Sequence, residues 1–151
     1  MGSEEDKALP ISEQGKGKKK KTGPEKLFQA RLQRFMKKYG IYNFKYFATR
    51  YAKRGVPDII ACTSPDGKFW GIETKSEHGH PRPEQKEAIN QITDLGGIGC
   101  IVWPEEEYLL KAALIGHKEA REILKGKTGR DRKEATKWTP QRLKSIITSL
   151  L

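Results

Sequence analysis

Two carboxylates and one lysine in this chain could do chemistry together: Asp58, Glu73 and Lys75. Taken singly, each could be a solvated strand residue or one half of a cross-strand ion pair. If the two carboxylates lie side by side, their like charges destabilise the strands that carry them unless a cation compensates. Oxygen ligands favour a hard divalent ion, so the expected cofactor is Mg²⁺, with Mn²⁺ as a substitute.

A predicted β-hairpin brings these residues together. Two apolar runs flank Ser64-Pro65-Asp66-Gly67, which has Pro and Gly where a type I turn favours them. A four-residue turn pairs Thr63 with Lys68, and counting outward along both strands places Asp58 opposite Glu73. A bulge in the turn would shift this pairing by one residue and leave the carboxylates as neighbours.

The neighbours of this pair follow from side-chain periodicity. Glu73 and Lys75 share one face of the return strand, while Thr74 points to the other face. Gln85 lies three, four and seven residues before apolar positions of a predicted helix, so it belongs to the face that packs on the sheet. It either orients groups in the site or hydrogen-bonds backbone or water at the helix start.

Glu25 is a further candidate metal ligand, from the first predicted helix. It shares a helix face with Phe28, Leu32 and Met36, so it could reach the site from the packed side of that helix. The alternative is a capping box, in which Thr22 and Glu25 close the helix start.

The elements that must position these residues can be read from periodicity and from turn residues. We expect, in order, a helix from the capping box to Tyr39, strands over 42–51, 56–62 and 69–75, a helix from Pro83 to about Leu95, a strand over 98–103, a helical stretch over 105–125 broken near Gly116, and a last helix from Thr139. The order α-β-β-β-α-β with helical additions predicts an α/β or α+β domain, with a sheet flanked by helices.

The charge changes sign along the chain. Residues 1–14 carry −3, residues 15–54 carry +13, residues 55–110 carry −6 and residues 111–151 carry +7, which together make the net charge of +11. An acidic centre between two basic flanks suits a metal site surrounded by a surface that binds a polyanion. We therefore expect a partner with a phosphate backbone, contacted by Lys18, Lys19, Lys20, Lys21, Lys53 and Arg54.

The chain divides into three segments by composition. Residues 1–21 have few apolar side chains and end in a lysine run, which predicts a disordered basic arm. Residues 22–125 form the predicted domain, and residues 126–151 are expected to be a basic linker followed by an amphipathic helix. That helix carries an apolar stripe, which either packs on the domain itself or forms a dimer interface: Leu143, Ile146, Ile147, Leu150 and Leu151.

The motif residues resemble those of the PD-(D/E)xK nucleases, and within them the VRR-NUC group. The shared pattern is G-x-P-D at Gly55–Asp58, a hairpin, E-x-K at Glu73–Lys75, and a downstream Gln at Gln85. The resemblance covers residues 25–103. It implies a restriction-endonuclease-like αβββαβ core with a mixed sheet and a Mg²⁺-dependent endonuclease acting on DNA.

The resemblance also implies roles and a substrate. Asp58, Glu73 and the backbone carbonyl of Thr74 would hold the metal, Lys75 would position the attacking water, and Gln85 would orient the water or Lys75. Small stand-alone members of the group, viral or bacterial, imply a homodimer acting on branched DNA such as a Holliday junction. The alternatives are a sequence-specific, restriction-type endonuclease and a non-catalytic DNA-binding module that keeps the fold.

Several other classes of protein are disfavoured by the sequence. Cys62 and Cys100 lie in apolar runs and are expected to be buried thiols. The pair His78 and His80 lacks further ligands at zinc-site spacing. No run of about 20 apolar residues suggests a membrane span, so we expect an intracellular, cytoplasmic protein.

Overall fold

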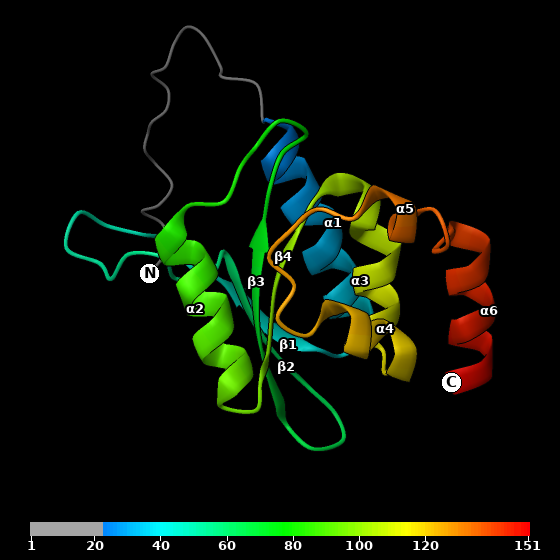
Figure 1. Ribbon diagram of the computed structural model, residues 1–151. Helices are drawn as coiled ribbons and strands as arrows, with labels where there is room; N and C mark the ends of the chain where they lie inside the picture. The colour runs from blue at the N-terminus through cyan, green and yellow to red at the C-terminus, as the bar shows by residue number, and fades with distance from the viewer. Residues whose placement is uncertain (1–22) are drawn as a thin grey trace, which may run out of the picture.

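A four-stranded mixed sheet forms the centre of the molecule. The computed structural model describes residues 23–151, so the predicted arm at residues 1–21, with Lys18 to Lys21, lies outside the described residues. The strands, in sheet order, are β1 (Tyr42–Lys45), β2 (Ile59–Thr63), β3 (Lys68–Thr74) and β4 (Ile98–Val102). The first two pairings are antiparallel and the last is parallel (Figure 1).

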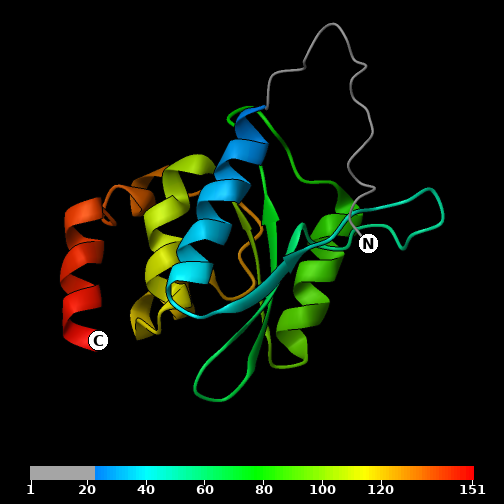
Figure 2. The same cartoon turned by 180° about the vertical axis from the view of Figure 1, so that it is seen from behind.

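Helices cover the two faces of this sheet unequally. One face packs against α1 (Pro24–Lys38) and α3 (Glu107–Leu114), and α2 (Pro83–Asp94) lies against β3 and β4 on the other face (Figures 1 and 2). The remaining elements are a 3₁₀ turn η3 (Pro104–Glu106) and the helices α4 (Lys118–Leu124), α5 (Arg132–Ala135) and α6 (Pro140–Leu150). The α+β class and the predicted αβββαβ order of the core are confirmed.

The hairpin has the predicted register. Thr63 pairs with Lys68 and Ile59 with Ile72, so the next step outward places Asp58 opposite Glu73. The turn residue Gly67 adopts a positive φ of 67°, which glycine adopts without steric cost. The register expected from the turn residues is therefore sufficient to align the two carboxylates.

The start of α1 differs from the prediction. Gly23 is the N-cap, and no side-chain hydrogen bond caps the helix there. Glu25 instead lies within 3.4 Å of the Thr74 hydroxyl and of the Gln29 amide nitrogen. The capping-box interpretation of Glu25 is therefore wrong, and the carboxylate faces the predicted site.

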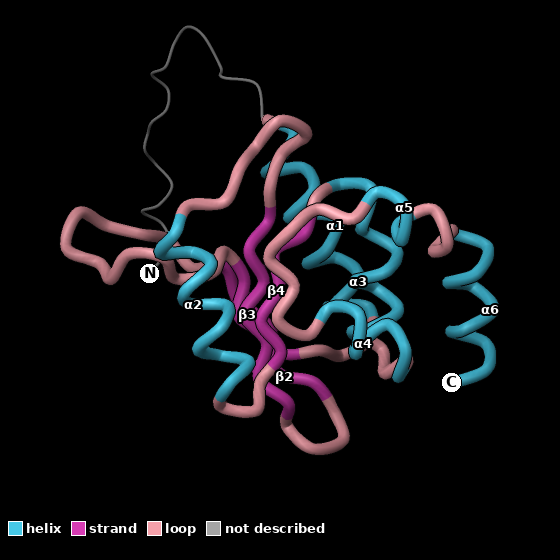
Figure 3. The backbone as a smooth tube through the Cα atoms, viewed as in Figure 1, coloured by secondary structure: helices cyan, strands magenta, loops and turns pink. Residues whose placement is uncertain are grey.

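The predicted strand over 42–51 is too long. Strand β1 ends at Lys45, and residues 46–58 form a loop that projects from the sheet (Figure 3). The last hydrogen bond between these segments is the one that the Tyr46 N–H donates to the Asp58 carbonyl, at 2.8 Å. Beyond this pair no further backbone hydrogen bond joins residues 47–52 to residues 53–57.

The main core lies between the sheet and the helices α1 and α3. Its largest fully buried side chains include Phe28, Leu32, Met36, Ile59, Trp70, Ile72, Leu109 and Leu110. A smaller cluster of Ile89, Ile101 and Trp103 lies under α2. Helix α2 approaches β4 so closely that a Cβ on Gly99 would lie 2.6 Å from the Ile89 carbonyl oxygen, which accounts for glycine there.

The segment after residue 125 is not a linker. Lys127 forms a bridge with Cys100 beside β4, and its buried ammonium lies 2.7 Å from Glu106. Arg130 binds Glu105, and α5 follows directly. These long-range ion pairs fix the segment to the domain. Its residues have too little apolar periodicity for the sequence to predict that packing.

The apolar stripe of α6 mostly packs on the chain's own core. Leu143 and Ile146 are buried in it, and Ile147 packs against it. Only Leu150 and Leu151, at the end of the chain, are exposed. The intramolecular alternative therefore holds for Leu143 and Ile146, whereas Ile147 is only half-buried.

The two cysteines lie in different environments. Cys100 is fully buried, and burial raises the pKa of its thiol to about 12. Cys62 is exposed, contrary to the prediction, because α2 covers β3 and β4 and leaves that face of β2 open. Among the described residues, none of the helices has the length and apolar character needed to cross a bilayer.

Candidate active site

Asp58 lies at the open edge of β3, where β2 has not yet begun. Its Oδ2 accepts hydrogen bonds from the backbone N–H and the hydroxyl of Thr74, each at 2.9 Å. The G-x-P-D segment positions it: Pro57 is buried against Gly71, and Gly55 adopts φ 78°. Asp58 is thus held in one place by the strand that carries Glu73.

Glu73, Gln85 and Lys75 form a hydrogen-bonded chain on the α2 side of the sheet. The Gln85 amide nitrogen donates to Glu73 Oε2 at 2.9 Å, and Lys75 Nζ donates to Gln85 Oε1 at 2.8 Å. Lys75 Nζ also lies 3.6 Å from Glu73 Oε2. Gln85 Oε1 accepts in addition from the Arg82 backbone N–H at 2.9 Å, so Gln85 both organises the site and closes the start of α2.

Glu73 is an acid in an unfavourable place for a charge. It is 4% exposed, and its Oε1 has no hydrogen-bond partner among the described residues. Burial, and then the charge of Asp58, raise the pKa of Glu73 to about 8, although Lys75 acts in the opposite direction. Without a cation, Glu73 therefore holds a proton near neutral pH.

A second set of polar groups lies on the α1 side of the same strand. Buried Gln29 donates its amide to the Thr74 hydroxyl at 2.7 Å, and Glu25 lies at the edge of this group. Burial and the charge of Asp58 raise the pKa of Glu25 as well. Asp58 therefore lies between two carboxyl groups, that of Glu25 on the α1 side of the sheet and that of Glu73 on the α2 side, and its charge acts on both.

Gln29 was not among the predicted site residues. The pattern that could have identified it is the one that identified Gln85, because Gln29 lies three and seven residues before the buried Leu32 and Met36. Its Oε1 is also buried without a partner among the described residues. Thr74, expected to contribute only its carbonyl, contributes its N–H and hydroxyl by holding Asp58.

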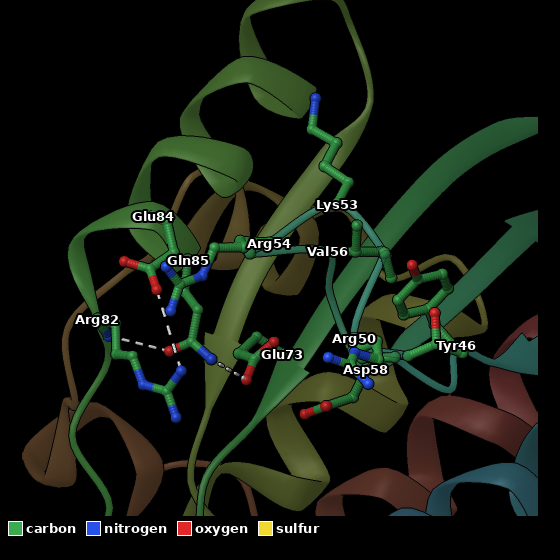
Figure 4. A pocket seen from close by; sticks show the side chains of 14 residues that line it. Tyr46, Arg50, Lys53, Arg54, Val56, Asp58, Glu73, Arg82, Glu84 and Gln85 are labelled. Atoms are coloured by element: carbon green, nitrogen blue, oxygen red, sulfur yellow. Dashed lines mark hydrogen bonds and ion pairs between the residues drawn. The ribbon is translucent and has the colours of Figure 1, made fainter.

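A pocket of about 510 Å³ opens onto Asp58 and Glu73. Its walls come from the loop between β1 and β2 and from the first turn of α2 (Figure 4). The predicted DNA-contacting residues Lys53 and Arg54 line it, and so do residues that the sequence did not single out, among them Tyr46, Arg50, Arg82 and Glu84. The pocket thus has Asp58 and Glu73 at its base, and four of the five charged residues on its walls are cations.

The donor set fits a hard cation. Among residues 23–151 no three His, Cys, Asp or Glu side chains already converge in a metal-binding cluster. Asp58 nevertheless lies close enough for its charge to raise the pKa of Glu73, and the buried Glu73 Oε1 has no hydrogen-bond partner among the described residues. A divalent ion would remove both unfavourable features, and oxygen ligands suit Mg²⁺. His78 and His80 are both exposed in the loop before α2.

Comparisons with known proteins give a limited likeness. No family model matches the chain, and no curated protein matches it. A solved structure of Hjc, a Holliday junction resolvase from the archaeal hyperthermophile Archaeoglobus fulgidus, aligns with a TM-score of 0.41 and 16% identity. The alignment covers 52% of this chain and 66% of that one. The VRR-NUC resemblance stays a prediction, and the function proposed below rests on the geometry of the site.

Proposed function

We propose that this chain is a metal-dependent endonuclease that hydrolyses phosphodiester bonds in DNA. The observation that carries the proposal is the buried Glu73, with one oxygen unpartnered among the described residues, beside Asp58 at the base of a pocket with cationic walls. A protein that only bound DNA would gain nothing from two close carboxyl groups under a phosphate-binding surface, since they repel the ligand.

Each residue then has a role that follows from its contacts. Asp58 and Glu73 would hold Mg²⁺, with the Thr74 carbonyl as a further ligand, and Glu25 is near enough to join them. The ion, when bound, lowers the pKa of coordinated water and polarises the phosphate.

Lys75 is the group placed to act on the phosphate. Gln85 holds its ammonium at 2.8 Å, so the charge is fixed in direction before the substrate binds. There it orients the attacking water and stabilises the negative charge that develops on the phosphoryl oxygens. Arg50, Lys53 and Arg54, on the pocket wall, would bind flanking phosphates.

The first test is cleavage by carboxylate variants. Asp58→Ala and Glu73→Ala should each reduce Mg²⁺-dependent cleavage by at least about a thousandfold, while DNA binding in Ca²⁺ persists. Glu122→Ala, an exposed acid on α4, is the matched control. Cleavage near the wild-type rate in either site variant would exclude this active site, and binding without any cleavage by the wild type would favour a non-catalytic module.

For the substrate we propose branched DNA, cut by a homodimer, as the sequence resemblance implies. Symmetric incision of a four-way junction needs two centres related by a two-fold axis, and the proposed site supplies one per chain. The wild type should cut a four-way junction faster than a linear duplex of its arms in Mg²⁺, and not in EDTA. Sedimentation should give a dimer at tens of micromolar. A monomer, or equal cleavage rates on both DNAs, would exclude the junction-specific dimer and leave only the proposal of a nuclease without preference for branched DNA.

A further inference from the structure

The loop between β1 and β2 exposes two aromatic rings beside the site. Phe47 is 74% exposed and Tyr51 is 87% exposed. Large rings usually gain stability by burial, so two of them held in water in one short loop are costly unless a ligand covers them. The strand predicted here would instead have packed alternate rings on the sheet.

Each of these rings lies beside a cation. Lys45 Nζ is 5.4 Å from the centroid of the Phe47 ring, and Arg50 Cζ is 5.4 Å from that of Tyr51. Residues 45–57 contain four lysines and arginines and no acid. The loop therefore presents flat apolar faces and positive charge together, which is the combination that single-stranded nucleic acid binds through stacked bases and a charged backbone.

The loop is fixed against the catalytic residues at both ends. Tyr46 N–H bonds the Asp58 carbonyl at 2.8 Å, and Gly55 packs on the first turn of α2 at Glu84. Tyr46, Arg50, Lys53 and Arg54 of this loop line the pocket that contains Glu73 (Figure 4). Phe47 and Tyr51 do not line the pocket but are adjacent in sequence to the lining residues Tyr46 and Arg50, so a strand that extends out of the pocket past this loop would meet them.

We propose that Phe47 and Tyr51 stack on unpaired bases next to the scissile phosphate at the Asp58–Glu73 site. The substrate class is then DNA with unpaired nucleotides flanking the cleaved bond, such as a branch point or a gap, in preference to a continuous duplex. The inference rests on the proposed nuclease function for the scissile phosphate. A second copy of this chain is a poor occupant, because residues 45–57, with a charge of +4, would meet a molecule of charge +11.

Fluorescence can test the stacking directly, because the three native tryptophans are buried. Trp70, Trp103 and Trp138 are at most 3% exposed, so Tyr51→Trp adds one solvent-accessible reporter. In EDTA, where cleavage is off, adding (dT)12 should quench the new emission by about half, and the same concentration of hairpin duplex should quench it much less. Phe69→Trp, at an exposed ring near the turn end of the hairpin, is the control and should not respond. Absence of quenching, or equal quenching by duplex, overturns the proposal.

Affinity gives an independent measure. The double variant Phe47→Ala/Tyr51→Ala should bind a gapped duplex about tenfold or more weakly in EDTA, with an unchanged salt slope because no charge is removed. Phe69→Ala should bind as the wild type does. Equal weakening toward intact duplex would assign the rings a structural role instead. If Tyr51→Trp is quenched but no Mg²⁺-dependent cleavage exists, the base-binding loop stands and the nuclease proposal fails; cleavage without quenching gives the reverse.

Discussion

At the scale of single residues, Glu73 is the least stable charge in the site. Its raised pKa of about 8 comes first from burial and then from Asp58, and the Oε1 without a partner among the described residues is the structural sign of the same problem. Gln85 and Lys75 bind only Oε2. The site is therefore suited to a cation from solution.

The pH dependence of stability should report this directly. Because the folded pKa of Glu73 is about 8 and the ordinary value is 4.5, the folded chain binds more protons between these pH values. Its contribution to the free energy of unfolding is thus present below pH 4.5 and is lost as the pH rises to about 8, by at most about 1.4 kcal/mol per pH unit.

Urea unfolding in EDTA at pH 5, 6.5 and 8 measures this effect. The difference in unfolding free energy between the wild type and Glu73→Gln should change across that pH range. Mg²⁺ should stabilise the wild type more at pH 8 than at pH 5. Glu122→Gln changes an exposed residue, so its unfolding free energy should have the same pH dependence as that of the wild type. If the unfolding free energy of Glu73→Gln has the same pH dependence as that of the wild type, the Glu73 carboxyl group titrates near its ordinary pKa.

At the scale of elements, the loop after β1 and the helix α2 must meet for the pocket to exist. Gly55 makes that meeting possible, because its φ is 78° and a Cβ there would lie 2.5 Å from the Glu84 carbonyl oxygen. Gln85 follows Glu84 in the same turn, so any displacement of α2 at this point also moves the group that holds Lys75.

Two glycine substitutions separate backbone strain from this close approach. Gly40 also has a positive φ, of 70°, but nothing lies within 4 Å of its position for a Cβ. We expect Gly40→Ala to cost about 1–2 kcal/mol of unfolding free energy from strain alone, and Gly55→Ala to cost about 1–3 kcal/mol more. Urea denaturation measures both. Gly55→Ala should also slow cleavage, and equal costs for the two variants would mean that the loop does not pack tightly on α2.

At the scale of the whole molecule, basic residues surround one small acidic centre, an arrangement that would favour the approach of the DNA proposed as substrate. The described part places basic residues of the β1–β2 loop around the pocket. The lysine-rich run at residues 15–21 lies outside the described residues and adds five more positive charges along the chain. Phosphate binding by that run would strengthen the affinity for any DNA without selecting a sequence.

Two truncations test the contribution of this run. Deleting residues 1–21 should weaken binding to all DNAs alike and reduce the salt slope by about 0.9 log units for each phosphate that the run neutralises in the full chain. Deleting residues 1–14 alone removes a segment of charge −3, keeps the lysine run, and should retain the slope. Equal slopes for the full chain and both truncations would show that the run does not bind the phosphates.

The sequence by itself determined whatever depends on neighbours along the chain. The turn at residues 64–67 set the pairing of Asp58 with Glu73. Gly40, with its positive φ, follows the end of α1, and helical periodicity placed Gln85 against the sheet. Tertiary structure decided what depends on distant partners. Gln29 reaches Thr74 across 45 residues, Lys127 pairs with buried Glu106, and the chain after Lys45 leaves the sheet and packs on α2 at Glu84. Local pattern does not encode such partners, because the free energy of those interactions exists only once the elements are packed.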